Sequence, residues 1–320
     1  MTISRAVFVA LLSCVSAVSS AADYPDKPIH LIVAYPAGGS TDMIARLYAE
    51  KLAQELDQSV VIENKPGAGT NIGSNLVANA KPDGYTVLFG GGTPSINSVF
   101  GPFPPFDPVK SFEQVSMVTQ VPFMVGAGNN APFSTLKEML AKANQSPGKY
   151  TISSAQLNLY VELMKFRAGL PIMHVPYKGG AQATTDAIGG QVDTVFSLVP
   201  VLLPHIQAGR LKPVAVSAQH RIAVLPDVPT FQENGVNYDI GVWFGLLAPA
   251  GTPQPIVDKL AQATQRIVKQ KSFASRLEEI GAQAVATTPA ELRAHMEAEV
   301  RDWKALADSV PELRKAVSPR

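Results

Sequence analysis

The feature that most constrains this chain is an alternation of strand-like and helix-like segments that starts at residue 28. Apolar residues recur at helical spacing in one kind of segment, and short β-rich runs bounded by turn residues form the other. The alternation comprises strands at 28–34, 59–62 and 85–89 and helices at 42–56 and 71–80. This βαβαβ order predicts an α/β fold, with a parallel sheet and helices on both faces.

A proline-rich stretch at 102–108 interrupts the pattern, and an extended run at 115–125 leads into a second alternation. That alternation comprises helices at 135–144, 157–168, 181–188 and 201–208 and strands at 150–154, 173–176, 192–196 and 212–217. The run at 243–248 predicts a return to the first sheet, because only helical segments follow, at 255–269, 273–280 and 289–307.

Two alternations with two crossings predict two lobes, and 320 residues exceed the ~150 of one typical domain. We expect residues 23–122 and 243–320 to form lobe 1 and residues 123–242 to form lobe 2. Open α/β sheets bind ligands beyond the carboxyl ends of their strands, so the strand-to-helix loops facing the cleft are the place to look for function.

Residues 1–22 have the order of a cleaved signal peptide, with Arg5, an apolar run at 6–18 and small residues before Asp23. The run is shorter than the roughly 20 residues that span a bilayer, so we predict export with a cleaved leader rather than a retained anchor. Lipid attachment at Cys14 is the alternative. Cleavage after residue 22 would leave no cysteine, because the chain has only one.

Loss of Arg5 with the leader would leave 26 basic and 26 acidic residues, from 27 and 26 in the whole chain. The chain has no basic block that would neutralise phosphates. We therefore expect neither nucleic acid nor an anionic membrane as a partner.

The first loop of chemical interest reads Pro-Ala-Gly-Gly-Ser-Thr-Asp at 36–42. Glycines let the backbone approach a ligand, and the N-terminus of the following helix offers free N–H groups and a positive dipole end. The loop predicts an anion site made of Ala37, Gly38, Gly39, Ser40, Thr41 and Asp42. The alternative is a simple turn in which Ser40 or Thr41 caps the helix.

The second loop reads Gly-Ala-Gly-Thr-Asn-Ile-Gly at 67–73. Its G-x-G-x-x-x-G spacing, and its place after the second strand, argue against a dinucleotide site. It is a second glycine-rich helix N-terminus on the same sheet edge, and we expect Ala68, Gly69, Thr70 and Asn71 to complete the anion site. A tight turn without a ligand is the alternative.

Catalytic and metal-binding patterns are missing. The five histidines show no H-x-x-x-H or H-E-x-x-H spacing, and neither a G-x-S-x-G elbow nor a phosphate-binding P-loop occurs. We therefore predict no catalytic residue, metal or cofactor. His174 is interpreted as a hydrogen-bonded structural residue rather than a base, and Trp243 and Phe244 as core residues rather than a stacking platform.

Nearly the whole mature chain resembles the solute-binding receptors of tripartite tricarboxylate transporters, the Bug-type receptors. Nine motifs carry the resemblance, in order over about 230 residues. They are YPDKPI at 24–29, PAGGSTD at 36–42 with Ala45-Arg46, VVIEN at 60–64, GAG at 67–69 with Ile72-Gly73, KPDGY at 81–85, HVPYKG at 174–179, GGQVD at 189–193, LPDVPT at 225–230, and Trp243 with APAGTP at 248–253.

The resemblance implies a Venus-flytrap fold of the type II periplasmic binding proteins. It also implies a ligand carboxylate held by the loops at 37–42 and 68–71, largely through backbone groups and bridging waters. The second lobe then sets specificity, and its candidate ligand residues are Ser153, Ser154, Tyr177 and Asp193. The implied partners are a di- or tricarboxylate, amino-acid or aromatic acid and separate permease subunits. We expect a monomer.

The chain departs from the family pattern where the family has a glycine-rich loop and a His-Leu-x-x-Glu helix start. Here residues 154–162 read SAQLNLYVE, with Asn158 at the histidine position. The segment at 93–97 also lacks the usual Asn-Pro pair. We expect a reshaped second-lobe wall and a ligand outside the familiar acids. A sensor that signals to a membrane kinase, or a secreted enzyme acting on a carboxylate, are the alternative functions.

Overall fold

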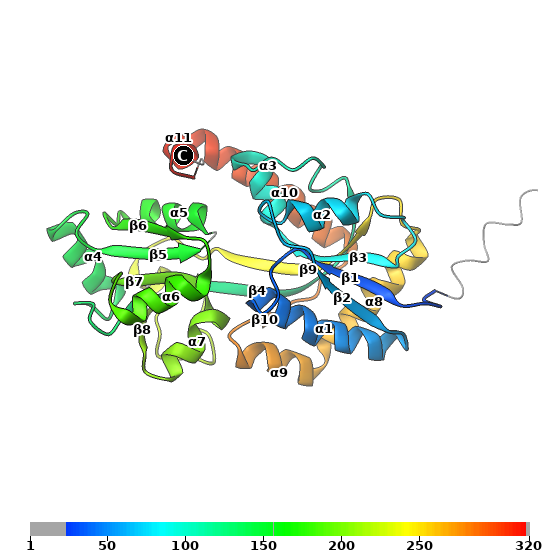
Figure 1. The fold of residues 1–320 in the computed structure, drawn as a ribbon, viewed down its shortest axis with the longest axis horizontal. Coiled ribbons are helices and arrows are strands. Elements are labelled where there is room, and N and C mark those ends of the chain that lie inside the picture. Colours follow the sequence, from blue (N-terminus) through cyan, green and yellow to red (C-terminus); the bar gives the residue numbers. More distant parts are fainter. Residues whose placement is uncertain (1–23, 156, 318–320) are drawn as a thin grey trace, which may run out of the picture.

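The computed structural model describes residues 24–155 and 157–317. Their strands form one curled sheet in the order β2-β1-β3-β9-β4-β7-β5-β6, with β8 and β10 also paired to β4. Two α/β lobes lie side by side and share the long strands β4 and β9 (Figure 1). The strands are β1 (Ile29–Val33), β2 (Val60–Asn64), β3 (Thr86–Gly91), β4 (Phe112–Gly128), β5 (Thr151–Ala155), β6 (Met173–Tyr177), β7 (Thr194–Leu198), β8 (Leu211–Val216), β9 (Gly241–Pro249) and β10 (Gln283–Ala284).

Helices cover both faces of the sheet, as the alternation predicts. They are α1 (Ser40–Leu56), α2 (Asn71–Ala78), α3 (Thr93–Phe100), α4 (Leu136–Gln145), α5 (Asn158–Ala168), α6 (Gly180–Gly189), α7 (Val199–Gln207), α8 (Gln254–Lys269), α9 (Lys271–Glu279), α10 (Pro289–Ser309) and α11 (Pro311–Val317), with a short 3₁₀ helix at Gln232–Asn234. The sequence did not predict α3, α11 or β10. Among the described residues, no helix has the length and apolar character that crossing a membrane requires. The leader and Cys14 lie outside the described residues.

The sheet is mixed rather than wholly parallel. Strand β1 is parallel to β2 and β3, and β5 is parallel to β6 and β7. The shared strands are antiparallel to their neighbours: β9 pairs with β3 and β4, and β4 continues to pair with β7 and β8. The prediction of parallel pairing is therefore confirmed for β1 with β2 and β3 and for β5 with β6 and β7, and it is wrong where β4 and β9 pair with each other and with β3, β7 and β8.

Separate apolar clusters fill the two faces of each lobe. In the first lobe, Tyr48 of α1 and Leu260 of α8 lie in one cluster, and Leu88 and Trp243 lie in another. Both Trp243 and Phe244 are buried, as predicted for core residues. These clusters hold the strands in place, and with them the loops at the strand ends.

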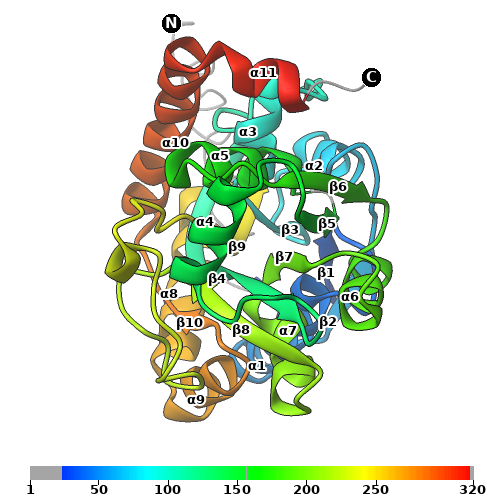
Figure 2. The same cartoon turned by 90° about the vertical axis from the view of Figure 1, so that its left-hand side faces the viewer.

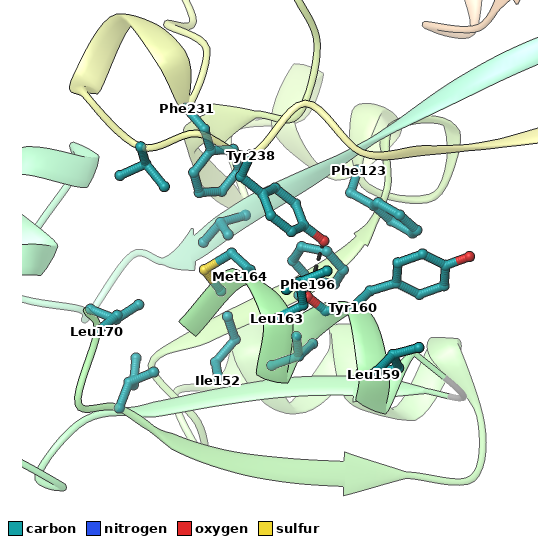
Figure 3. Packing of buried hydrophobic residues seen from close by; sticks show 14 of the residues in the cluster. Phe123, Ile152, Leu159, Tyr160, Leu163, Met164, Leu170, Phe196, Phe231 and Tyr238 are labelled. Atoms are coloured by element: carbon teal, nitrogen blue, oxygen red, sulfur yellow. Dashed lines mark hydrogen bonds between the residues drawn. The ribbon is translucent and has the colours of Figure 1, made fainter. Parts of the chain in front are cut away.

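The largest cluster of the second lobe reaches across to the first. Its aromatic centre contains Phe123, Phe196 and Tyr238 (Figure 3), with the Phe123 and Phe196 rings 4.9 Å apart. The same cluster includes residues of α3, α10 and α11, and the Trp303 ring on α10 contacts Tyr160 on α5 edge-on at 6.1 Å. Helix α10 runs up one side of the molecule, and α11 lies across its top, above α3 and α5 (Figure 2). The lobes are thus joined by these contacts as well as by β4 and β9.

Candidate functional site

The loop between β1 and α1 is exposed and ends at a helix N-terminus without a side-chain cap. Residues 36–39 are exposed, and Gly39 is the N-cap of α1 with no capping hydrogen bond from a side chain. Neither Ser40 nor Thr41 caps the helix, so that alternative is wrong. Among the described residues, the amides of Gly39, Ser40 and Thr41 have no acceptor. Three N–H groups are therefore free for a ligand or water.

Asp42 holds this loop in shape. Its Oδ2 accepts hydrogen bonds from the Gly38 amide and from Arg46 Nε, both at 2.9 Å, and its Oδ1 accepts one from Asn64 Nδ2 at 2.9 Å. Burial alone would raise the pKa of Asp42, but these bonds outweigh it and hold that pKa below its usual value. The Asp42 carboxylate is fully engaged within the protein, and so it positions the loop rather than facing an anion.

The loop between β2 and α2 has an unusual backbone. Gly67, Ala68, Gly69 and Thr70 all have positive φ values, of 128°, 47°, 59° and 74°. Asn97 of α3 holds the loop, because its Nδ2 donates to Gly69 O at 2.7 Å. Among the described residues, the amides of Gly69 and Thr70 have no acceptor, and the buried Thr70 Oγ1 has no partner. The two amides have hydrogen-bonding capacity to offer a ligand, and Thr70 Oγ1 is an unpaired polar atom just beneath them.

The two loops lie next to each other because their strands are neighbours. Strands β1 and β2 are parallel with Val33 opposite Asn64, so both chains leave the sheet at the same edge. Asn64 Nδ2 also donates to Tyr35 O at 3.1 Å, which ties the start of one loop to the end of the other strand. The structure thus brings together the predicted residues 37–42 and 68–71. We call these two segments the anchor loops.

In the second lobe, Ser153 and Ser154 are fully buried near the end of β5. Ser153 Oγ donates to Ala183 O and Thr194 O, at 3.1 and 3.2 Å. Tyr177, at the end of β6, is half-buried and donates to Asp186 Oδ2 at 2.7 Å. Of the predicted second-lobe residues, Tyr177 thus keeps accessible surface at the edge that faces the first lobe.

Asp193 does not lie at that edge. It immediately precedes β7, and its Oδ2 accepts hydrogen bonds from the amide and the hydroxyl of Thr151, the first residue of β5. It therefore marks the amino-terminal end of both strands, opposite the anchor loops. The structure separates Asp193 from the other candidates, because its carboxylate fixes the start of β5.

Ser154, His174 and Glu162 stand in the order of a nucleophile, a base and an orienting acid. Ser154 Oγ lies 2.8 Å from His174 Nε2, and His174 Nδ1 lies 3.0 Å from Glu162 Oε1. Glu162 also pairs with Lys165 at 2.9 Å. Ser154 has no exposed surface, so its hydroxyl cannot reach a substrate. The hydrogen bonds tie β5 and β6 to α5, as expected of a structural His174.

Sequence reasoning missed a group of residues behind the first anchor loop. Tyr35 OH lies 3.0 Å from Thr93 Oγ1, at the start of α3. Trp243 Nε1 donates to Glu299 Oε1 at 3.3 Å, and Gly92 lies so close that a Cβ there would stand 2.3 Å from that oxygen. No local motif marks Glu299, because only the docking of α10 on α3 brings it here.

Two other kinds of site receive no support from the geometry. Within the described ranges, no group of three or more His, Cys, Asp or Glu residues could hold a metal ion. A hollow of about 400 Å³ lies between α5 and α11, lined by Phe166, Leu170 and Leu313 among others. None of the anchor-loop residues lines it.

Two α/β lobes that share crossing strands, with free amides at the strand ends of one lobe, define a binding protein of the periplasmic solute-binding class. The chain belongs to the tripartite tricarboxylate transporter receptor family, whose model matches residues 44–311. This confirms the resemblance and the fold class predicted from the sequence.

Relatives and solved structures agree with this assignment. Protein BugT of Bordetella pertussis is 32% identical over 296 residues, which cover 90% of this chain and 91% of BugT. A Rhodopseudomonas palustris protein solved with adipate is 32% identical, with a TM-score of 0.83 and coverage of 90% and 99%. MatC of Rhodopseudomonas palustris, solved with malate, is 30% identical, with a TM-score of 0.78 and coverage of 88% and 99%.

Proposed function

We propose that this protein is a periplasmic receptor that binds a small carboxylate between its lobes and delivers it to a tripartite tricarboxylate transporter permease. The observation that carries the proposal is the pair of adjacent anchor loops with unpaired backbone amides. Two helix N-termini at one sheet edge favour an anion without a cationic side chain. The adipate and malate in two related structures support a carboxylate ligand.

Capture without chemical change follows from the same geometry. Ser154 is buried, and the carboxylate of Asp42 is occupied by Arg46, Gly38 and Asn64. An enzyme would need a nucleophile or base within reach of the substrate. Two of the related structures named above hold an acid, adipate or malate, and we therefore propose that this chain binds its ligand and releases it intact.

The ligand would be enclosed by closure of two lobes, residues 23–122 with 243–320 and residues 123–242. Strand β4 changes its partners from β9 to β7 and β8 near Pro122 and Phe123, and β9 begins at Gly241. These crossings are where a hinge would bend, and binding would select the closed arrangement. The candidate contact on the second lobe is Tyr177, which keeps accessible surface, whereas Ser153 and Ser154 are buried and would support the end of β5 rather than touch the ligand.

A thermal-shift screen of the mature protein against small carboxylic acids tests the proposal. A ligand at 100 times its Kd adds about 2.7 kcal/mol to the stability of the native state, which should raise Tm by several degrees. Ser40→Leu and Thr70→Leu, which place bulk at the free amides, should abolish the shift. Ser272→Leu, at an exposed position of α9, is the control and should retain it.

Two outcomes would contradict the proposal. One is that no carboxylate in the screen raises Tm. The other is that the shift persists undiminished in both anchor-loop variants, because the anion would then be held elsewhere.

A further inference from the structure

Glu299 is the residue whose surroundings neither the fold nor the anchor loops explain. It lies on α10, between β9 and the N-terminus of α3, and its Oε2 is buried with no close hydrogen bond among the described residues, although the Ser95 hydroxyl lies near enough to stabilise the carboxylate. The residue nevertheless keeps some accessible surface, as does Tyr35, which precedes the first anchor loop. Glu299 therefore combines an unpaired buried oxygen with incomplete burial, unlike the apolar residues that surround it.

The groups around Glu299 come from four parts of the chain. Trp243 on β9 donates to its Oε1, and Ser95 lies beside it on α3. Its charge acts on Tyr35 and on Tyr160, which comes from α5 of the second lobe. Figure 3 shows the Tyr160 hydroxyl pointing away from the cluster that holds its ring.

Helix α10 itself adds three neighbours. Asp302 acts on Glu299 through its charge, whereas His295 and Trp303 lie one turn before and after it. Burial lowers the pKa of His295, so that it is neutral near pH 7. None of the surrounding groups named here supplies a positive charge to balance an ionised Glu299.

Burial has the expected effect on this carboxyl. It raises the pKa of Glu299 to about 7, despite the opposing effect of the Trp243 and Ser95 side chains, and the Asp302 charge raises it further. Glu299 therefore exchanges its proton in the neutral range, where small changes in nearby charge alter its protonation.

We propose that Glu299 is a proton-binding residue of the ligand site, which takes up a proton when an anion occupies the anchor loops and so couples ligand capture to proton uptake. Tyr35 connects the surroundings of Glu299 with the anchor loops. Its backbone leads into the first anchor loop, and its hydroxyl is hydrogen-bonded to Thr93, next to Gly92. A second negative charge nearby disfavours the ionised form of Glu299. The proposal rests on the proposed function only for the chemical nature of that anion.

The protein carries its own reporter for this proton. Its two tryptophans, Trp243 and Trp303, flank Glu299, one as a hydrogen-bond donor and one on the next turn of α10. Tryptophan fluorescence followed from pH 5 to pH 9 should show a transition near pH 7 in the wild type. Glu299→Gln should remove it, and Glu297→Gln, at an exposed position of the same helix, should keep it.

A fixed charge in the anchor loop tests the coupling without any ligand. Ser40→Asp places a carboxylate at the N-terminus of α1, and Ser40→Asn places a neutral group of the same shape there. We expect the transition to move to higher pH in the first variant only. Three results would each overturn the proposal. They are a wild-type curve without a transition, a transition that persists in Glu299→Gln, and equal midpoints in the two Ser40 variants.

Adipate then separates this proposal from the proposed function. If adipate binds at the anchor loops, it should raise the midpoint as Ser40→Asp does, and its affinity should fall by about three- to tenfold from pH 6 to pH 8.5 in the wild type but not in Glu299→Gln. Adipate that binds with the same affinity at both pH values would overturn the coupling. If Ser40→Asp moves the midpoint and no carboxylate binds, the coupling stands and the proposed function fails.

Discussion

At the scale of single residues, the conformation of the first anchor loop depends on Asp42. One carboxylate joins the loop amide of Gly38, the helix residue Arg46 and the strand residue Asn64. The sequence placed Asp42 in the site, but it could not tell a ligand contact from a positioning role, because Asn64 lies on β2 and only the fold brings it to the Asp42 carboxylate. A buried acceptor with several donors is costly to lose, since each donor is left unsatisfied.

Asp42→Asn should therefore lower the free energy of unfolding by about 1–3 kcal/mol at pH 7. Hydrogen bonding keeps the pKa of Asp42 in the folded protein below its usual value. The stability that the ionised carboxylate contributes is therefore fully present above the usual pKa, and it is lost as the pH falls through the lower pKa of the folded state. The Tm difference between wild type and variant should thus shrink from pH 7 to pH 3. Glu50→Gln, at an exposed site on the same helix, should show no such difference.

At the scale of elements, most helices and strands followed from local patterns, and the exceptions have physical reasons. Helix α3 was missed because three glycines and Pro94 precede its apolar residues, and Pro94 fits the first turn of a helix as well as it fits a loop. Its burial comes from α10, about 200 residues later, which no local pattern reveals. Asp193 was expected at the cleft, yet its place at the start of β7 sets it at the opposite end.

The close contact between α2 and the strands beneath it makes a further prediction. A Cβ at Gly73 would stand 2.7 Å from Lys65 O and 2.9 Å from Ala34 Cα, so Gly73→Ala must push α2 off β1 and β2. Overpacking of this kind costs about 1–3 kcal/mol, and it should also displace the second anchor loop and weaken carboxylate binding. Gly189→Ala, in α6 with no neighbour within 4 Å, is the matched control. Equal stability of the two variants, measured by urea unfolding, would contradict the expectation.

At the scale of the whole molecule, the lobes are connected by strands that can bend and by side chains that can separate. Strands β4 and β9 are continuous between the lobes, whereas the contact of Trp303 with Tyr160 is a packing contact. The Trp303 ring also contacts the ring of Phe100 on α3, which belongs to the same lobe as Trp303, with the ring centroids 6.3 Å apart. Both are edge-on ring contacts, but only the contact between Trp303 and Tyr160 crosses from one lobe to the other.

This difference yields a test of the proposed closure. Trp303→Leu removes an aromatic contact that forms only when the lobes are together and that is worth about 0.5–1.5 kcal/mol. The variant should therefore favour separated lobes and bind the carboxylate about two- to tenfold more weakly. Small-angle X-ray scattering without ligand should show a larger radius of gyration than that of the wild type. Phe100→Leu removes a similar contact within the first lobe, and it should lower Tm without changing the scattering. If both variants scatter like the wild type and bind with unchanged affinity, the Trp303–Tyr160 contact does not hold the lobes together, and closure depends on β4, β9 and the ligand.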